Sequence, residues 1–411
     1  MGAKKVIKKQ EKVQPEVNIG LVGHVDHGKT TLLEALSGKW ADTHSEEQKR
    51  GITIKLGYAD VSFYSCKEHG FAAKKICDKC EFLRKVSFVD APGHESLMAT
   101  MLSGAAIMDG ALLLVAANEQ CPQPQTREHL MALELMGINK IVIVQNKIDL
   151  ASKERVLENY NQIKEFIKGT IAENASIIPI SSHHKVNINY LIQAIQETIL
   201  TPERDATKKP IMFIARSFDV NRPGTKIDKI VGGVLGGSIK QGMLKVGDKI
   251  QIAPGRQVTE KGQTKWVAIK TTIRSINAGG ENVTEAGPGG SLGVLVGLDP
   301  SIVKSDQLSG SVICKEGELP PLWETLTIKP KLLQRIVGLK KEEKIEPIKK
   351  GEPLMINVNS EITAGFVVEL KKDKVIINLK RPLCAEIGSK LALSRRIGTS
   401  WKLIGMAELG K

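Results

Sequence analysis

The chain has 411 residues and a formal net charge of +14, from 59 lysines and arginines against 45 aspartates and glutamates. Apolar residues make up 41% and charged residues 25%, proportions that are ordinary for a globular protein and exclude a disordered or collagen-like chain. The longest uninterrupted apolar run covers only residues 111–117. A membrane-spanning helix needs about 20 such residues, so we expect a soluble, cytoplasmic protein of about two to four domains.

The first half of the chain alternates between two kinds of segment. Residues 1–16 contain five lysines and no apolar period, which predicts a flexible basic arm. Strand-like segments then alternate with helix-like ones, the strands at residues 17–22, 86–89, 111–116, 140–144 and 177–180 and the helices at residues 29–37, 126–136, 153–167 and 188–199. For residues 17–208 this order predicts an α/β domain with a mostly parallel sheet and helices on both faces.

The rest of the chain has a different pattern. Residues 201–210 are polar and bracketed by prolines, as is typical of a linker. Short β-branched runs then alternate with Pro-Gly and Gly-Gly turns, without a long helical period, which predicts a β-barrel domain over residues 209–327. A proline-rich break at residues 319–321 precedes a block of similar composition, so we predict a second β-barrel domain over residues 328–411.

A phosphate-binding motif follows the first predicted strand. Residues 23–30 (GHVDHGKT) match the pattern G-x-x-x-x-G-K-[ST] between a strand and a helix, which is the context that this motif requires. Its glycines let successive backbone N–H groups face phosphate oxygens, and the helix N-terminus adds a partial positive charge. We expect Lys29 to reach the β- and γ-phosphates and the Thr30 hydroxyl to bind Mg²⁺.

Two further motifs follow apolar strands and make the site specific. Asp90, in the segment DAPGH, ends a strand at the place where a carboxylate supports bound Mg²⁺ from behind its direct ligands. Asp149, in the segment NKID, can accept hydrogen bonds from both N1–H and the exocyclic amine of guanine. Adenine has no such pair of donors and would leave the carboxylate unpaired. The three motifs together predict a site for GTP.

A fourth segment lies between the phosphate-binding motif and Asp90. Thr53, in the segment EQKRGITI, has a hydroxyl that could complete the Mg²⁺ shell only while the γ-phosphate is present. Such a loop would become ordered with GTP and relax with GDP, as a switch does. Spacing alone leaves a second interpretation open, because a threonine in a loop is usually only a turn residue.

Three of the six cysteines lie close together in the sequence. Cys66 and His69 form C-x₂-H, and Cys77 and Cys80 form C-x₂-C. Three thiolates and one imidazole can close a tetrahedral Zn²⁺ site with no open position, which predicts a structural zinc knuckle inserted at residues 64–84. The alternative is that the thiols are spare and His69 is a surface residue.

The basic excess is concentrated near the C-terminus. Residues 328–411 hold 18 basic and 9 acidic side chains, whereas residues 1–208 hold 26 and 25. Such a surplus indicates a polyanionic partner, most simply a nucleic acid. The alternative is a solvated, lysine-rich surface.

Taken together, GHVDHGKTTL, RGITI, DAPGH and NKID resemble the motifs of the translational GTPases, the family of elongation factor Tu. The later segment GGVLGGSIKQGMLKVGDKI resembles the second domain of that family, a β-barrel. A closer resemblance is to the gamma subunits of archaeal and eukaryotic translation initiation factor 2, in the segments HSEEQKRGITIKLGYAD, MATMLSGAAIMDG, PQPQTREHLMALE, RSFDVNRPGT and SRRIGTSWKLIG. It covers nearly the whole chain beyond the basic arm.

The resemblance implies roles for residues around the nucleotide. The phosphates would be held by Asp26, His27, Gly28, Lys29, Thr30 and Thr31. Thr30 and Thr53 would hold Mg²⁺, and Asp26 with the Gly51 carbonyl would hold a second cation. The expected catalytic residues are His94, Asp90 and Lys29, with His94 orienting the attacking water in place of the glutamine of small GTPases.

The resemblance also implies a guanine pocket and a metal ligand set. Asn146, Lys147 and Asp149 would read guanine, with Ser181, Ser182 and His183 beneath it. Ser181-Ser182-His183 departs from the usual Ser-Ala-Leu/Lys, which changes the stacking below the base. His69 stands where the gamma subunits commonly have a cysteine, and it remains a competent zinc ligand.

The implied function is a GTPase that carries methionyl initiator tRNA to the small ribosomal subunit and is released after GTP hydrolysis. It would act in a heterotrimer with alpha and beta subunits, use GTP or GDP, Mg²⁺ and Zn²⁺, and have no membrane partner. Hydrolysis should be slow alone and stimulated by partners, because no arginine finger lies in the motifs. Candidate tRNA contacts are Arg395, Arg396 and Lys402, with plain surface charge as the alternative for each.

Three other functions remain open. The chain could be an elongation-type or specialised aminoacyl-tRNA carrier, or a regulatory GTPase subunit of a metabolic enzyme. It could also be a scaffold that has lost hydrolysis, although Thr30, Asp90 and His94 argue against this.

Overall fold

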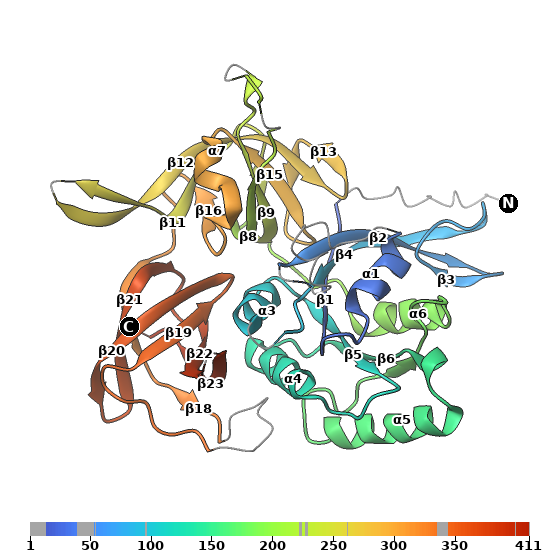
Figure 1. Cartoon of the computed structure of the whole chain (residues 1–411). Coiled ribbons are helices and arrows are strands. Elements are labelled where there is room, and N and C mark those ends of the chain that lie inside the picture. The colour runs from blue at the N-terminus through green and yellow to red at the C-terminus, as the bar shows by residue number, and fades with distance from the viewer. Residues whose placement is uncertain are drawn as a thin grey trace.

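The computed structural model describes residues 14–38, 53, 55–94, 97–221, 224–226, 229–260, 262–334, 344–398 and 400–410. Most of the predicted basic arm and Gly51 of the predicted cation site lie outside these residues. The described chain forms a helix-rich N-terminal domain (β1 to α6), a middle barrel (β8 to β16) and a C-terminal barrel (β17 to β23), as Figure 1 shows.

The N-terminal domain is built on a seven-stranded sheet in the order β3-β2-β4-β1-β5-β6-β7. Its strands are β1 (Asn18–Gly23), β2 (Gly57–Cys66), β3 (Gly70–Ala72), β4 (Glu81–Asp90), β5 (Gly110–Ala116), β6 (Ile141–Asn146) and β7 (Ile177–Pro179). The five strands from β4 to β7 in this order pair in parallel, while β2 pairs antiparallel to β4 and β3 pairs antiparallel to β2. The predicted mostly parallel sheet is confirmed.

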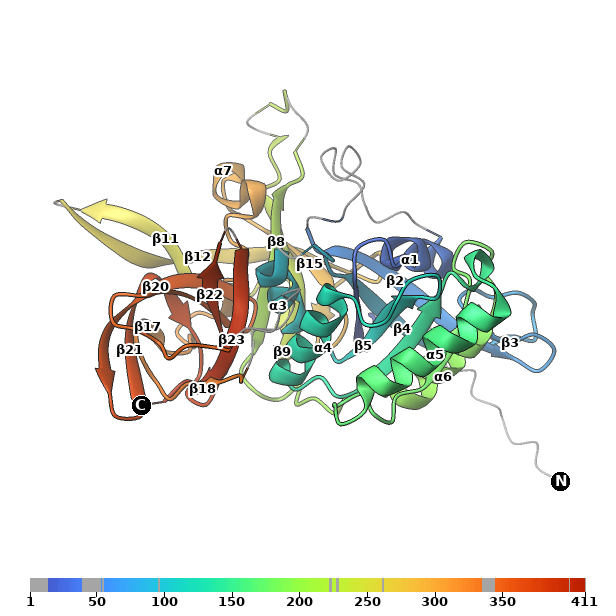
Figure 2. The same cartoon turned by 60° about the horizontal axis from the view of Figure 1, so that its bottom comes forward.

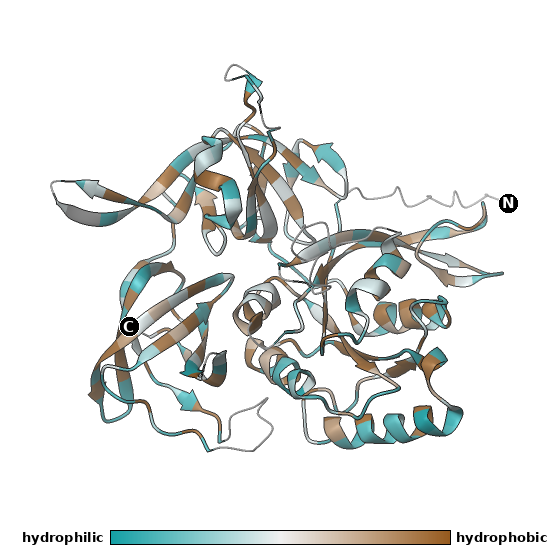
Figure 3. Cartoon of the chain, in the orientation of Figure 1, coloured by the Kyte–Doolittle hydropathy of each residue, from teal (hydrophilic) through white to brown (hydrophobic). Residues whose placement is uncertain are grey.

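Helices cover both faces of this sheet, as predicted. They are α1 (Lys29–Ser37), α3 (Met98–Ala105), α4 (Pro124–Met136), α5 (Lys153–Ile167) and α6 (Ile188–Thr198). Helices α1 and α6 pack in one apolar cluster, and α3, α4 and α5 in another on the opposite face. Figure 3 shows that α5 is mostly hydrophilic. This agrees with its burial pattern, because its buried residues are Asn159, Ile163 and Ile167 alone. A helix of this kind is readily predicted because its polar and apolar residues follow the helical period.

Helix α3 lies in a segment for which the sequence predicted no helix. Six of its eight residues are buried. Its apolar residues do follow the helical spacing, but two turns that include Gly104, a poor helix former, give only a weak signal in the sequence. It is buried because one side faces the parallel sheet and another faces the C-terminal barrel, where Ser103 Oγ donates to Ser360 O at 2.5 Å.

The middle barrel closes on itself. Its main strands run in the order β11-β16-β8-β9-β15-β12-β13, and an additional β11–β12 pairing joins the ends of the first six. The elements are β8 (Ile211–Asp219), β9 (Gly233–Gln241), β10 (Leu244–Lys245), β11 (Lys249–Glu260), β12 (Gln263–Ala278), β13 (Glu281–Val283), β14 (Glu285–Ala286), β15 (Leu292–Val296), α7 (Pro300–Val303), the 3₁₀ turn η4 (Lys304–Asp306) and β16 (Val312–Lys315). Alternate residues point inward, as Leu292, Val294 and Val296 of β15 do.

The C-terminal barrel has the strand order β17-β21-β20-β19-β22-β23-β18. Its strands are β17 (Leu322–Ile328), β18 (Lys331–Leu332), β19 (Pro353–Val358), β20 (Glu361–Lys371), β21 (Lys374–Cys384), β22 (Lys390–Ile397) and β23 (Ser400–Glu408). An antiparallel bridge between Ile328 of β17 and Leu409, the residue after β23, brings these two strands together. The prediction of two β-barrel domains is therefore confirmed as a fold class.

A buried ion pair joins the N-terminal domain to the C-terminal barrel. Helices α3 and α4 lie against β19, β22 and β23 in both views (Figures 1 and 2). There Lys402 Nζ lies 2.7 Å from Glu128 Oε1, and both side chains are 3% exposed. Removing one partner of such a pair costs about 3–5 kcal/mol, so the contact fixes how the two parts meet. Among the described residues, no helix has both the length and the apolar character needed to cross a membrane.

Candidate functional site

The loop between β1 and α1 has a shape that only glycine allows at two positions. Gly23 has φ 142°, and a Cβ there would lie 2.5 Å from Leu114 O. Gly28 has φ 88°, and a Cβ there would lie 2.4 Å from Asn146 Nδ2. Both φ values are in the region that favours glycine, and both contacts are closer than a side chain tolerates. The two glycines of the motif are therefore required by the packing of the loop against β5 and β6.

A buried histidine supports this loop from behind. His129, on α4, accepts a hydrogen bond at Nδ1 from the Gly23 N–H at 2.8 Å and is 1% exposed. Burial, together with the nearby positive charge of Lys29, lowers the pKa of His129 to about 3, so the ring is neutral at pH 7. Sequence reasoning missed this residue, because a histidine inside an amphipathic helix carries no local signal of its contact.

His27, which the sequence places among the phosphate-binding residues, has a fully buried side chain. Its Nδ1 lies 2.9 Å from Leu114 O, and its Nε2 lies 3.5 Å from Glu119 Oε2. The ring thus fastens the loop to β5 and the segment after it. Only the backbone of His27 is left to face a ligand, which is the part that a phosphate loop uses.

The lysine of the motif lies within the loop. Lys29 is 7% exposed, and its Nζ donates to Gly23 O at 3.0 Å and to His24 O at 2.9 Å. The DAPGH segment approaches it closely, since a Cβ on Gly93 would lie 2.6 Å from Lys29 Nζ. The ammonium is therefore at the place where the first strand, the loop and the end of β4 converge. A cation held there suits the phosphates of a nucleotide.

The structure brings three of the predicted metal-site residues together. Thr30 Oγ1 donates to Asp90 Oδ2 at 2.8 Å and lies 3.2 Å from Thr53 Oγ1. Oxygen donors from a helix start, a strand end and the predicted switch segment thus share one point, and oxygen is the donor that Mg²⁺ prefers. Asp26 is exposed on the outer side of the loop with φ 61°. Thr31 follows in the first turn of α1.

The NKID segment is held to the phosphate loop by Asn146. Its Nδ2 donates to His27 O at 2.9 Å, and its Oδ1 accepts from Ser182 N at 3.0 Å and Ser182 Oγ at 2.9 Å. Asn146 therefore connects the loop after β7 to the phosphate loop, and it binds them with both ends of its amide. Its neighbour Lys147 adopts φ 62° at the start of the 3₁₀ turn η2 (Ile148–Leu150).

Asp149 is ionised in this arrangement. A hydrogen bond from Ser181 lowers the pKa of its carboxyl below the usual value, and the nearby rings of His184 and His183 act in the same direction. Ser181 and Ser182 are buried, whereas His183 is exposed and packs edge-on against His184 at 4.8 Å between ring centroids. An ionised carboxylate beside two buried serines can accept from paired N–H donors such as those of guanine.

His94 is exposed at the end of the DAPGH segment, and its carbonyl accepts from Leu97 N at 2.9 Å. It directly follows Gly93, the residue next to Lys29 Nζ. The residues between it and Leu97 lie outside the described chain.

The predicted zinc ligands meet where β2, β3 and the segment before β4 come together. The ligand atoms of Cys66, His69 and Cys77 lie within 4.8 Å of one another. Cys77 Sγ is 3.6 Å from both Cys66 Sγ and Cys80 Sγ, which is too long for a disulfide. The Cys77 N–H donates to Cys80 Sγ at 3.3 Å, which brings the fourth predicted ligand to the cluster. The donor set fits a soft divalent ion such as Zn²⁺.

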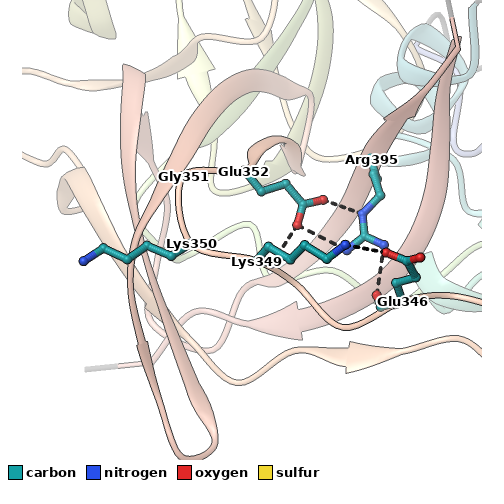
Figure 4. A pocket seen from close by; sticks show the side chains of 6 residues that line it. All are labelled: Glu346, Lys349, Lys350, Gly351, Glu352 and Arg395. Atoms are coloured by element: carbon teal, nitrogen blue, oxygen red, sulfur yellow. Dashed lines mark hydrogen bonds and ion pairs between the residues drawn. The ribbon is translucent and has the colours of Figure 1, made fainter.

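The candidate tRNA contacts have different surroundings. Lys402 is buried against Glu128, so it is not a surface contact. Arg395 lines a shallow basin of about 350 Å³ on the C-terminal barrel (Figure 4), where it pairs with Glu352 and donates to the carbonyls of Glu346 and Pro347. Its charge is largely balanced there. Of the three, Arg396 alone is exposed.

Comparisons with known proteins give the class to which the chain belongs. Family models match three successive segments: the elongation factor Tu GTP binding domain matches residues 14–201, elongation factor Tu domain 2 matches residues 232–314, and the C-terminal part of initiation factor eIF2 gamma matches residues 324–409. The fold and the site thus define a translational GTPase of the elongation factor Tu class, which uses GTP or GDP with Mg²⁺.

Relatives that match nearly the whole chain identify the family within this class. Translation initiation factor 2 subunit gamma of Methanocaldococcus jannaschii is 57% identical over 407 residues, which are 98% of this chain and 99% of that protein. The subunit of Archaeoglobus fulgidus is 58% identical over 399 residues, 95% of this chain and 93% of that protein. The chain belongs to the family of the gamma subunit of translation initiation factor 2.

Solved structures of lower identity share the fold. A bacterial selenocysteine-specific elongation factor, EF-Sec, superposes with a TM-score of 0.73 at 24% identity over 96% of this chain and 58% of that chain. The elongation factor SelB of Methanococcus maripaludis, in complex with the GTP analogue GPPNHP, superposes with a TM-score of 0.71 at 22% identity, over 98% of this chain and 80% of that chain.

His129 gives the stability of the chain a pH dependence that a glutamine would remove. In the folded chain its pKa is about 3, against the ordinary 6.5, so between these values only the unfolded chain takes up the proton. The stabilisation by the neutral ring is complete above pH 6.5 and is lost as the pH falls. Glutamine in its place still offers an acceptor to the Gly23 N–H.

From pH 7 to pH 5 we expect the wild-type chain to lose about 2 kcal/mol more unfolding free energy than His129→Gln. Chemical unfolding of both proteins at the two pH values measures the difference. An identical loss in both would show that His129 is charged or solvated in the folded chain.

Proposed function

We propose that this chain is the GTP-switched subunit that binds methionyl initiator tRNA and delivers it to the small ribosomal subunit. The observation that carries the proposal is the 57% identity to translation initiation factor 2 subunit gamma over nearly the whole of both chains. It is supported by a site in which a phosphate loop, a threonine pair and a guanine-reading segment are held together by hydrogen bonds. Binding would be followed by GTP hydrolysis, slow alone and stimulated by partners.

Within this proposal each site residue has a role. The phosphates are held by the backbone of Asp26, His27 and Gly28 and by Lys29, Thr30 and Thr31. Thr30 and Thr53 hold Mg²⁺ with Asp90 behind them, and Asp26 with the Gly51 carbonyl holds a second cation. His94 orients the attacking water, and an exposed imidazole can turn toward the γ-phosphate to do so.

Guanine selection is assigned to Asp149, with Asn146 and Lys147 beside it and Ser181, Ser182 and His183 below the base. Asp149→Asn should weaken GDP binding about ten- to a hundredfold, because the side chain keeps only one uncharged acceptor and turns an NH₂ donor toward the exocyclic amine of guanine. It should at the same time admit xanthosine diphosphate, whose 2-oxo group can accept from the new amide. Asp205→Asn is the control, since Asp205 is an exposed aspartate that only caps its own turn. A variant that kept its guanine preference would remove this assignment.

We also propose that Cys66, His69, Cys77 and Cys80 hold a structural Zn²⁺. Natively purified protein should contain about one zinc per chain, and Cys66→Ser should lose it. Cys121→Ser replaces a cysteine far from the cluster in sequence and should retain the metal. Metal analysis of the three proteins tests this, and wild-type protein without zinc would exclude the proposal.

The proposed partners are methionyl initiator tRNA, the alpha and beta subunits of the factor and the small ribosomal subunit, in the cytoplasm. The basic excess of residues 328–411 supports a nucleic-acid contact, with exposed Arg396 as one candidate. Because phosphate contacts release counterions, tRNA binding should weaken steeply with salt.

Filter binding tests the function as a whole. Labelled methionyl initiator tRNA and an elongator aminoacyl-tRNA are titrated against protein loaded with a non-hydrolysable GTP analogue or GDP. The titrations are made with and without the alpha subunit and at two salt concentrations. We expect GTP-favoured, initiator-selective and salt-sensitive binding. Equal binding of both tRNAs would favour an elongation-type carrier, and no binding of either would leave a GTPase with another client, such as a metabolic enzyme.

A further inference from the structure

One carboxylate of the middle barrel is bound to the N-terminal domain beside the predicted switch threonine. Asp306, at the end of η4, accepts at Oδ2 from Lys55 Nζ at 2.6 Å. Its Oδ1 accepts from Arg216 Nε at 2.9 Å and from the Ser217 N–H at 3.0 Å. The Asp306 side chain is 18% exposed, so these contacts are partly shielded from solvent. A single side chain therefore joins β8 of the barrel to Lys55.

A second contact secures the next residue of the same segment. Arg216 Nη1 donates to Leu56 O at 3.0 Å, while its Nε remains on Asp306. Leu56 itself is buried, with its side chain against α3, where a Cβ on Gly104 would lie 2.6 Å from Leu56 Cδ2. Both the side chain of residue 55 and the backbone of residue 56 are thus fixed by the Asp306–Arg216 pair.

The segment fixed by these contacts, Lys55 and Leu56, begins two residues after Thr53. Two residues of chain span at most about 7 Å, so the position of Lys55 limits where Thr53 can lie. The Thr53 hydroxyl is 3.2 Å from Thr30 Oγ1, at the predicted Mg²⁺ position. Holding Lys55 and Leu56 in place therefore restricts the hydroxyl to the neighbourhood of the metal.

The charge state and the backbone of Asp306 suit this task. Burial would raise the pKa of its carboxyl, but the hydrogen bond from Lys55 and the charge of Arg216 outweigh burial and the pKa lies below its usual value. Ser305 and Asp306 both have positive φ, 57° and 62°, a conformation that non-glycine residues adopt infrequently. Such backbone is retained where surrounding contacts enforce it, and here it aims the carboxylate at Lys55.

We propose that Asp306 is a positioning residue for the GTP-bound state. It fixes the segment after Thr53 to the middle barrel, so that the Thr53 hydroxyl is presented to the nucleotide-bound Mg²⁺, and barrel docking thereby favours GTP over GDP. The inference rests on the proposed role of Thr53 as a ligand of that metal. It gives the middle barrel a part in nucleotide discrimination without any contact to the nucleotide.

Three variants test the inference through the ratio of the affinity for a GTP analogue to the affinity for GDP. Asp306→Asn removes the charge but tolerates the positive φ and still accepts from Ser217, while Lys55→Met removes the link from the other side. Lys55→Arg keeps the ion pair. The control is Glu352→Gln, which removes a similarly shielded carboxylate–arginine pair within the C-terminal barrel.

Dissociation constants for a fluorescent non-hydrolysable GTP analogue and for GDP are measured with Mg²⁺ and with EDTA. With Mg²⁺, Asp306→Asn and Lys55→Met should bind the GTP analogue five- to tenfold more weakly and GDP within twofold of wild type. In EDTA the difference from wild type should disappear. Lys55→Arg and Glu352→Gln should keep the wild-type ratio.

Three results would overturn the inference: an unchanged ratio in both test variants, an equal loss for both nucleotides, or a loss that persists in EDTA. A wild-type chain that bound neither guanine nucleotide would overturn the proposed function, and this inference with it.

Discussion

The phosphate loop keeps its shape because buried groups bind its backbone from several sides. His129 accepts from Gly23, Asn146 donates to His27 O, and the His27 ring is fastened to Leu114 O. Each of these groups comes from a different element of the N-terminal domain, and each lies at or near the carboxyl ends of its parallel strands. Backbone amides can serve an anion only when their directions are set in advance, so the site depends on this packing.

The chemistry of the site was predictable from sequence because each motif is local. A strand followed by GHVDHGKT, DAPGH or NKID puts Lys29, Asp90 and Asp149 at the same sheet edge whatever the rest of the chain does. The mostly parallel sheet and the two barrels followed from the spacing of apolar segments and turns. The candidate zinc ligands were recognisable as two short pairs, and the β2–β3 hairpin and the segment before β4 bring Cys66, His69 and Cys77 together.

What could not be predicted depends on contacts between distant segments. Helix α3 has only eight residues and is covered by segments distant in the sequence, so its own pattern is too short to identify it. Lys402 looks like a surface charge until α4 supplies Glu128 from 274 positions away. Asp306 lies in an irregular segment, and its partner Lys55 is 251 positions away in another domain. No local pattern distinguishes these four charged residues, Lys402, Glu128, Asp306 and Lys55, from ordinary surface charges, so only the folded chain shows what they contact.

The adjacent residues Glu128 and His129 give α4 two attachments that cannot be released gradually. One holds the C-terminal barrel through Lys402, and the other holds the phosphate loop through Gly23. The Lys402 and Glu128 side chains are only 3% exposed. When they first move apart, their attraction weakens before water can reach them, so partly opened arrangements have a high free energy. We therefore expect the barrel to separate from α4 in one step rather than gradually. Water hydrates the ammonium and the carboxylate once they are apart, and a partner that binds either charge would favour the opened arrangement.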